Sequence, residues 1–227
     1  EMCIRDSYSI ADKLESIKEE IIIAAENGGL VIENENTLLS TPLPKDSLLD
    51  IEKCIDDSND IHPVFCTRSK AYFKKTSYAY IDTISEYYPK HELIDSLDEI
   101  NEEILKIALY HNEDAEKHIF PLFKQFQTHY KVIVTGKNWV DISHELANKG
   151  YALKLIQDLY GINSEETLAF GDYDNDIEML NQSGFSYAME NANSNIKKMA
   201  IHHTTSNNHY GVELILKKLI EAKKGLL

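Results

Sequence analysis

The sequence has few of the features that mark a disulfide-rich, zinc-binding or membrane protein. Its three cysteines are odd in number and show no Cys-x-x-Cys or Cys/His spacing, which indicates neither a disulfide framework nor a structural zinc site. The longest aliphatic run, residues 21–25, is far shorter than the roughly 20 apolar residues that a membrane-spanning helix needs. No charged and then apolar leader opens the chain. We therefore expect a cytoplasmic protein that has no membrane partner.

Basic residues are also scarce. The 23 lysines and arginines stand against 38 aspartates and glutamates, and the formal net charge is -15. Such a charge repels nucleic acid backbones, so we expect no nucleic acid partner. An anionic ligand binds such a protein only where a metal ion or a fixed lysine reverses the local sign. The charge balance therefore predicts one focused cationic spot.

The first seven residues resemble a cloning or sequencing artefact more than a natural N-terminus. Residues 2–7, MCIRDS, can be encoded by ATG TGT ATA AGA GAC AGN, which resembles a transposase end sequence used in sequencing libraries. We therefore expect residues 1–7 to be artefactual and the reading frame to open inside a gene. A genuine short N-terminus is the alternative.

Apolar spacing divides the rest of the chain into regions of different pattern. Ile10, Leu14 and Ile17 have helical spacing, and a strand-like run follows at residues 21–25. Residues 42–143 mix strand candidates with helical stretches, which predicts an α+β region, although helix-on-helix packing over residues 90–130 is an alternative. The candidate strands are residues 63–67, 104–110, 130–135, 167–170 and 185–189, and the candidate helices are residues 115–127, 150–160, 175–181, 195–200 and 212–222.

The last third alternates helices and strands regularly, which predicts a parallel sheet covered on both faces. Because parallel neighbours need crossover connections, we expect the strand at residues 21–25 to join this sheet. The predicted fold class is therefore α/β. Residues 1–41 and 144–227 are expected to form a doubly wound parallel core, and residues 42–143 an inserted α+β domain.

The strongest chemical signal is GDYDND, residues 171–176, which lies between a strand candidate and a helix candidate. Open parallel sheets bind ligands outside the carboxyl ends of their strands. Asp172, Asp174, Asp176 and Glu178 concentrate negative charge that a cation would offset, and magnesium prefers such hard oxygen ligands. We predict that Asp172 and Asp176 reach one magnesium ion or its waters. Helix capping by Asp174, with the other acids complementing the helix dipole, is the alternative that these residues leave open.

A possible cationic partner lies upstream of the acidic segment. Lys149 and Gly150 stand just before a candidate helix, where a lysine can aim a compact positive charge at a phosphate. Taken alone, Lys149 favours the interpretation as an ordinary surface lysine. Its combination with the acidic segment favours a phosphate site.

The order of these motifs resembles the haloacid dehalogenase superfamily, and in particular its Cof-like branch, subfamily IIB. The matching segments are Lys149-Gly150, Gly161-Ile162, GDYDNDIEML at residues 171–180, Asn191-Ala192, HYGV at residues 209–212 and ENGG at residues 26–29. The resemblance covers most of residues 20–223. It implies a Rossmann-like core and a cap domain in the place of the insert.

The resemblance also implies roles for individual residues. Members of that family are magnesium-dependent phosphatases in which an Asp of a DxDGT loop attacks the phosphoryl group, while a second Asp is general acid and base. By position, Lys149 would be catalytic and would bind the substrate phosphate, and Asp172 and Asp176 would hold Mg²⁺. Asn175 would orient the site, and Asn191 would either shape the substrate-side loop or cap a helix. The implied partner is a small phosphorylated metabolite, a sugar phosphate foremost, bound by a monomer or weak homo-oligomer.

One departure from the family pattern is serious. No DxDGT segment occurs in the 227 residues, and no TTGR-like second motif precedes Ile10. We therefore expect the nucleophile and its core strand to be missing upstream, and the chain as given to bind ligands without completing covalent phosphoryl transfer. A noncatalytic phosphate- or magnesium-binding module and a phosphomutase are the alternatives.

Overall fold

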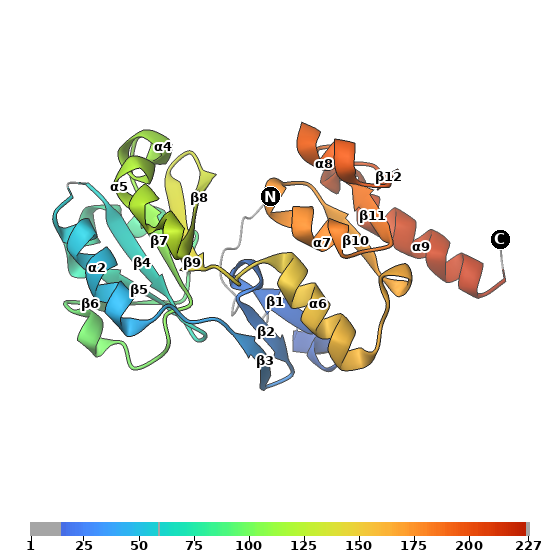
Figure 1. Ribbon diagram of the computed structural model, residues 1–227, viewed down its shortest axis with the longest axis horizontal. Coiled ribbons are helices and arrows are strands. Elements are labelled where there is room, and N and C mark those ends of the chain that lie inside the picture. The colour runs from blue at the N-terminus through green and yellow to red at the C-terminus, as the bar shows by residue number, and fades with distance from the viewer. Residues whose placement is uncertain (1–14, 59, 226–227) are drawn as a thin grey trace. The chain divides into compact units, whose positions relative to one another are not determined.

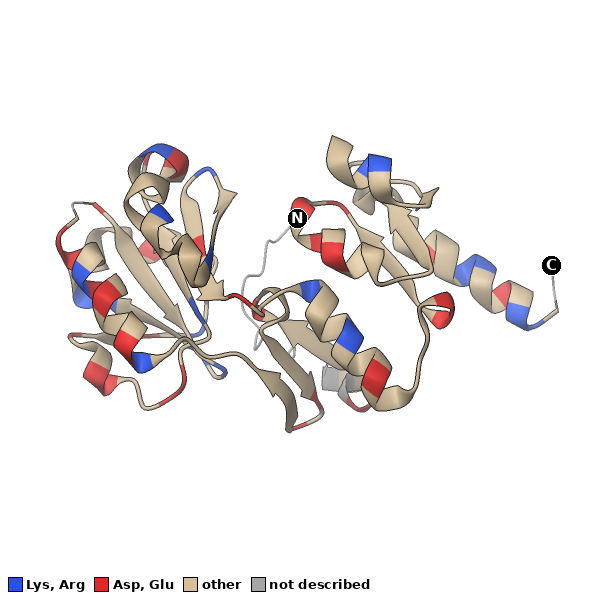
Figure 2. Cartoon of the chain, viewed as in Figure 1, with Lys and Arg blue, Asp and Glu red and all other residues tan. Residues whose placement is uncertain are grey.

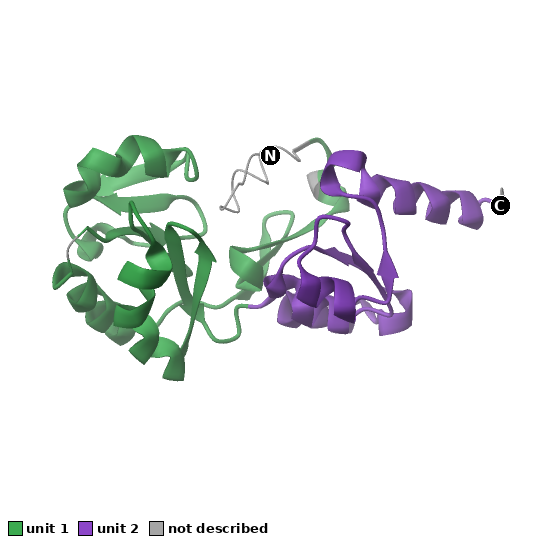
Figure 3. Ribbon diagram, turned by 90° about the horizontal axis from the view of Figure 1, so that it is seen from above, with its two compact units in different colours: residues 1–147 green, residues 148–227 purple. Residues whose placement is uncertain are grey.

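The chain divides into two compact units, residues 1–147 and 148–227 (Figures 1 and 3). The computed structural model describes residues 15–58 and 60–225. The segment expected to be artefactual therefore lies outside the described residues, and so does the first part of the helix expected from residue 10. The predicted division into residues 1–41 with 144–227 and residues 42–143 stays a prediction.

The first unit opens with a small antiparallel sheet. A 3-10 helix (Glu15–Glu20) leads into β1 (Ile22–Ala25), which pairs with β2 (Leu30–Glu33), and β2 pairs with β3 (Asn36–Ser40). The turn between β1 and β2 is tight, because the three residues 26–28 all have positive φ. This turn reverses the chain, so β1 finds its partner in β2. The described pairings do not include the expected pairing of β1 with the last third of the chain.

The second sheet of this unit has six strands. Their order is β6 (His91–Ile94), β5 (Ala71–Lys74), β4 (His62–Cys66), β7 (Lys106–Tyr110), β9 (Trp139–His144) and β8 (Tyr130–Gly136). Neighbours are antiparallel except β5 and β6. The helix-on-helix alternative for residues 90–130 is wrong, since that range contains β6 and β7.

Short helices supply the rest of the core of this unit. They are α2 (Lys45–Asp56), α3 (Ile81–Ser85), α4 (Ala115–His118) and α5 (Phe120–Phe123). Ile51 and Ile55 of α2 are buried against the sheet in one cluster, together with Phe123, while acidic and basic residues share the remaining surface of α2 (Figure 2). The single helix predicted over residues 115–127 is broken, because Pro121 has no N–H to continue the α4 hydrogen bonds.

The second unit holds a parallel sheet, as predicted. β10 (Leu168–Gly171) pairs with β11 (Phe185–Ala188), which pairs with β12 (His202–His203). The helices are α6 (Lys149–Tyr160), α7 (Ile177–Asn181), α8 (Ser194–Met199) and α9 (Gly211–Lys223). Small and medium apolar side chains such as Ala169, Leu180 and Ile196 form its core. Each predicted helix and strand of this region is present, with ends that differ by one or two residues.

Every described helix of the protein is too short or too polar to cross a membrane.

A buried ion pair joins the tight turn of the small sheet to the six-stranded sheet. Lys106 Nζ lies 2.9 Å from Glu26 Oε2 and 3.6 Å from Asp141 Oδ2, and the Lys106 and Glu26 side chains are 6% and 0% exposed. Desolvation lowers the pKa of Lys106, but the charge of Glu26, with those of Tyr88 and Asp141, outweighs it and holds the pKa well above its ordinary value. The ammonium therefore stays charged inside the protein.

Replacing this lysine tests the pair. We expect Lys106→Met to lower the free energy of unfolding by about 3–5 kcal/mol, because the buried carboxylate of Glu26 then loses the ammonium that lies 2.9 Å from it. Adding Glu26→Gln should recover part of the loss. Because the pKa of Lys106 is raised, its contribution is complete below the ordinary lysine pKa and is lost only as the pH rises through the raised value. Urea unfolding at pH 7 and pH 9 should therefore give equal losses, and a neutral Lys106→Met variant would contradict the prediction.

Candidate functional site

Three segments of the second unit meet at one edge of its parallel sheet. Because β10, β11 and β12 are neighbours that run in the same direction, the segments that follow them lie side by side. Backbone hydrogen bonds fix this arrangement: Met189 N–H donates to Gly171 O (3.1 Å), Asn193 N–H to Asp172 O (3.0 Å) and Thr204 N–H to Ala188 O (3.0 Å). The acidic segment that the sequence singles out begins at this edge.

Asp176 is the most engaged acid of the segment. Its Oδ2 accepts hydrogen bonds from the backbone N–H groups of Asp172 (3.0 Å) and Tyr173 (3.2 Å). Its Oδ1 accepts from Lys149 Nζ at 2.5 Å. The Asp176 side chain is 6% exposed and that of Lys149 is 34% exposed, so one end of the pair is buried and the other reaches solvent. Lys149 and Asp176, distant in the sequence, are thus brought together.

A helix cap and close packing at two glycines position Lys149, the first residue of α6, next to Asp176. Asn148 caps the helix, with its Oδ1 accepting from Tyr151 N–H at 2.6 Å. A Cβ at Gly150 would lie 2.6 Å from the Cβ of Glu178, so only glycine lets the start of α6 approach α7 this closely. A Cβ at Gly171 would lie 2.7 Å from the Cβ of Asp176. Both glycines therefore make room for the ion pair.

Asp172 is held differently, through one of its two oxygens. Its Oδ2 accepts from Asn191 Nδ2 (3.3 Å) and from Asn207 Nδ2 (3.1 Å). Asn207 N–H in turn donates to Asn191 Oδ1 at 2.9 Å. No residue in the described part of the chain donates to Asp172 Oδ1. The carboxylate therefore has one oriented oxygen and one that is open to a ligand.

Neither Asp174 nor Asn191 caps a helix, although Asp176 and Glu178 do lie in the first helical turns, as the dipole alternative expected. Asp174 is exposed and its Oδ1 accepts from Asn193 Nδ2 (2.9 Å) and Asn195 Nδ2 (3.2 Å), which ties the acidic loop to the start of α8 instead of capping a helix. The cap of α8 is Asn193, whose side chain accepts from the N–H groups of Asn195 and Ile196, and not Asn191. Asn175 is half-buried in the 3-10 turn Asp174–Asp176, and its orienting role stays a prediction.

The donor set at this edge fits magnesium. No group of three or more His, Cys, Asp or Glu side chains within residues 15–58 and 60–225 is arranged to hold a metal ion by itself. Magnesium, however, usually keeps several waters and is bound through one or two carboxylates together with substrate phosphates. The open oxygen of Asp172 suits such a site, whereas both oxygens of Asp176 are engaged. The metal roles of Asp172 and Asp176 stay predictions.

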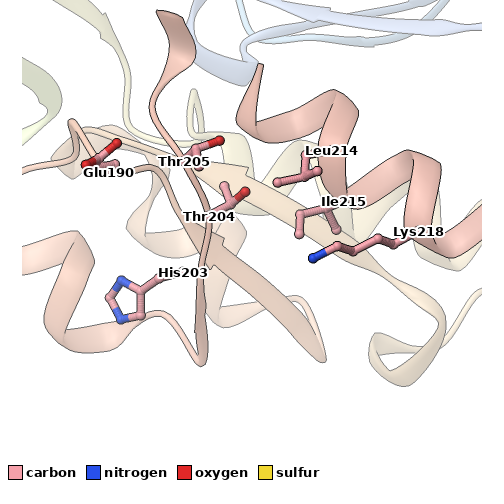
Figure 4. Close-up of a pocket in the computed structure, with 7 residues that line it drawn as sticks. All are labelled: Glu190, His203, Thr204, Thr205, Leu214, Ile215 and Lys218. Carbon is pink, nitrogen blue, oxygen red and sulfur yellow. The ribbon is translucent and has the colours of Figure 1, made fainter. Parts of the chain in front are cut away.

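A cavity of about 410 Å³ lies elsewhere in this unit, between α9 and the segment that follows β11 and β12 (Figure 4). Its lining residues are Glu190, His203, Thr204, Thr205, Leu214, Ile215 and Lys218. Lys149, Asp172 and Asp176 do not line it. The cavity therefore does not include the ion pair or Asp172.

Sequence reasoning missed the amide side chains that organise this edge. Asn207 orients Asp172, and Asn193 and Asn195 hold Asp174. The available signal was their position: each stands in a segment that follows a strand of the parallel sheet, where ligands bind. A search for polar residues after every candidate strand would have found Asn193 and Asn195, which follow the candidate strand at residues 185–189, but not Asn207, because no strand was predicted at residues 202–203.

The chain is similar in sequence to known proteins. The family model described as haloacid dehalogenase-like hydrolase matches residues 4–216. The chain is 30% identical over 216 residues to the 5-amino-6-(5-phospho-D-ribitylamino)uracil phosphatase YbjI of Escherichia coli K12, covering 94% of this chain and 80% of that protein.

Two solved structures have the same fold. SMU.1108c from Streptococcus mutans UA159 superposes with a TM-score of 0.82 at 24% identity, covering 95% of this chain and 83% of that one. The HAD subclass IIB sugar phosphatase BT4131 superposes with a TM-score of 0.77 at 16% identity, covering 98% of this chain and 84% of that one. These similarities confirm the predicted fold class, a Rossmann-like core with a cap.

Removing the central acid tests the structure of the edge. We expect Asp176→Ala to lower the free energy of unfolding by about 3 kcal/mol, because two backbone N–H groups and Lys149 lose their acceptor. Amide exchange at Asp172 and Tyr173 should accelerate. The matched control is Asp158→Ala, which removes the exposed partner of Lys154 on α6 and should cost under about 0.5 kcal/mol. Equal losses in urea unfolding of the two variants would contradict the buried pairing.

Proposed function

The chain belongs to the haloacid dehalogenase-like hydrolases, in their Cof-like phosphatase branch, and on this premise we propose that its residues carry the phosphate and metal groups of a magnesium-dependent phosphatase. The proposed reaction is hydrolysis of small phosphate monoesters, sugar phosphates foremost. The observation that carries the proposal is the pairing of Lys149 Nζ with Asp176 Oδ1 at 2.5 Å, at the sheet edge where Asp172 also stands. Preorganised charged groups stabilise the charge that develops on the phosphoryl oxygens during phosphoryl transfer.

Lys149 supplies the cationic spot that the net charge of -15 calls for. Its ammonium has three donors, and Asp176 Oδ1 engages one of them at 2.5 Å. The remaining donors are proposed to bind the oxygens of the transferring phosphoryl group. Because Asp176 is itself fixed by two backbone N–H groups, the lysine is oriented before a substrate arrives. Little reorganisation is then needed during the reaction.

Asp172 is proposed to hold the metal ion through its Oδ1. A bound Mg²⁺ would neutralise charge that develops on the phosphoryl oxygens. Asp176 would act on the site through Lys149 and through the shape of the loop, since both its oxygens are already engaged. Asn175 and Asn191 are proposed to contact or orient the substrate side of the same edge.

The covalent step needs a group that these residues do not supply. In the proposed mechanism a carboxylate of a DxDGT segment attacks phosphorus, the ester P–O bond breaks, and a second carboxyl gives a proton to the leaving alcohol. Water then hydrolyses the aspartyl phosphate. The 227 residues contain no DxDGT segment, and we propose that the nucleophile is supplied by residues outside them.

The proposed substrate class follows from the Escherichia coli relative. Its name describes the removal of a phosphate from a ribityl chain attached to an aminouracil. A phosphate ester on a sugar or sugar-alcohol chain is therefore the compound class that we propose to be accepted.

The incomplete set of catalytic groups has a direct kinetic consequence. We expect the 227-residue chain to show no turnover of p-nitrophenyl phosphate with Mg²⁺ above the buffer rate, because it lacks the nucleophile and the acid/base. A version extended by a DxDGT segment should turn over. Robust hydrolysis by the 227-residue chain would contradict the proposed mechanism. Failure of the extended version as well would favour the noncatalytic phosphate- or magnesium-binding module.

The role of the lysine can be tested in the extended, active version. We expect Lys149→Met to lower kcat by about 10²–10³-fold, the usual effect of removing a donor that stabilises transition-state charge. Lys154→Met is the matched control, because Lys154 lies on the same helix and forms an exposed pair with Asp158. Steady-state kinetics should show little change for the control. A comparable drop in both variants would assign the effect to the helix and not to Lys149.

A further inference from the structure

The orientation of Asp172 depends on a residue that no sequence motif assigned. Asn207 lies in the 3-10 turn Asn207–His209, after β12, and its Nδ2 donates to Asp172 Oδ2 at 3.1 Å. Asn191, after β11, donates to the same oxygen at 3.3 Å. The two asparagines and Asp172, which we call the amide ring, connect the segments that follow three neighbouring strands.

The amide ring has only one consistent pattern of donors. Asn207 N–H donates to Asn191 Oδ1 at 2.9 Å, so the oxygen of the Asn191 amide faces Asn207 and its nitrogen faces Asp172. Asn207 thus acts on Asp172 twice, once directly through Nδ2 and once by orienting Asn191. Both donors converge on Oδ2, and the described residues leave Oδ1 without a donor.

The position of Asn207 is itself determined by its loop. Ser206 N–H donates to Glu190 Oε2 (3.3 Å), and Ser206 Oγ lies 2.9 Å from His209 Nδ1. A Cβ at Gly211 would lie 2.1 Å from Thr205 O, so the start of α9 packs directly against Thr205, which lies between β12 and the turn. These contacts hold the backbone of the turn in place and so position the Asn207 side chain next to Asp172.

We propose that Asn207 is a positioning residue that keeps the open oxygen of Asp172 available to the divalent ion, an inference that rests on the proposed function of this edge. A carboxylate without these donors is free to rotate and to turn either oxygen to water. Groups that hydrogen-bond to metal ligands typically change metal affinity about 10–100-fold when they are removed. Since Asn191 still donates to Oδ2, the loss of Asn207 should fall near the lower end of that range.

The test measures metal binding to the 227-residue chain directly, without any activity. Mn²⁺ serves as the probe for the magnesium site, and free Mn²⁺ is followed by electron paramagnetic resonance in moderate salt. We expect Asn207→Ala to weaken Mn²⁺ binding by about tenfold. Asn208→Ala is the matched control, because this neighbour is also described and makes no hydrogen bond to Asp172. It should bind Mn²⁺ like the unchanged chain, and both variants should keep the same midpoint of thermal unfolding.

The variant Asp172→Asn distinguishes a failure of the proposed metal site from a failure of the proposed role of Asn207. If Asp172→Asn removes the binding while Asn207→Ala leaves it unchanged, the role of Asn207 is overturned and the metal site stands. If Mn²⁺ binding survives Asp172→Asn, the metal site in the proposed function is overturned, and the inference with it. A lower unfolding midpoint for Asn207→Ala at unchanged affinity would show a purely structural residue and would also overturn the inference.

Discussion

The ion pair between Lys149 and Asp176 is the interaction on which the candidate site depends. It joins the first residue of α6 to the loop after β10, and the same carboxylate closes that loop through two backbone N–H groups. A buried carboxylate is costly unless it is paired and hydrogen-bonded, and Asp176 meets both conditions. The protein therefore has a fixed cation at the edge of a sheet in a chain whose net charge is -15.

The three aspartates of the acidic segment have different roles because their carboxylates have different hydrogen-bond partners. Asp176 is saturated and organises the loop, Asp174 connects the loop to α8, and Asp172 keeps one oxygen open. Three aspartates of the same segment thus differ in whether a carboxylate oxygen remains available to a ligand. The asparagines that impose the difference come from segments after β11 and β12, so the parallel order of the strands is what assembles the edge.

The same physical rule appears in the first unit, where Lys106 is buried against Glu26 and Asp141. There the pair holds a turn with three consecutive positive φ angles against the six-stranded sheet. Glycine and asparagine adopt such angles readily, but a glutamate such as Glu26 does so rarely. Neither Glu26 nor Lys106 stood out as a charge pair in the sequence, since the two residues are far apart along the chain and each has an ordinary neighbourhood.

The sequence by itself determined the α/β class, the four helices and the first two strands of the last third, and the two segments that carry Lys149 and the acids, because local hydrophobic periodicity and strand-end motifs act over short stretches. It missed the two-residue strand β12. It did not reveal that residues 115–127 break at Pro121, that β1 pairs with β2, or which asparagine caps α8. Only the tertiary structure decided which oxygen of each acid is engaged and that Asn207 reaches Asp172. Those contacts join residues that are distant in sequence, and their geometry depends on strand order and on close packing at Gly150 and Gly171, which no local pattern encodes.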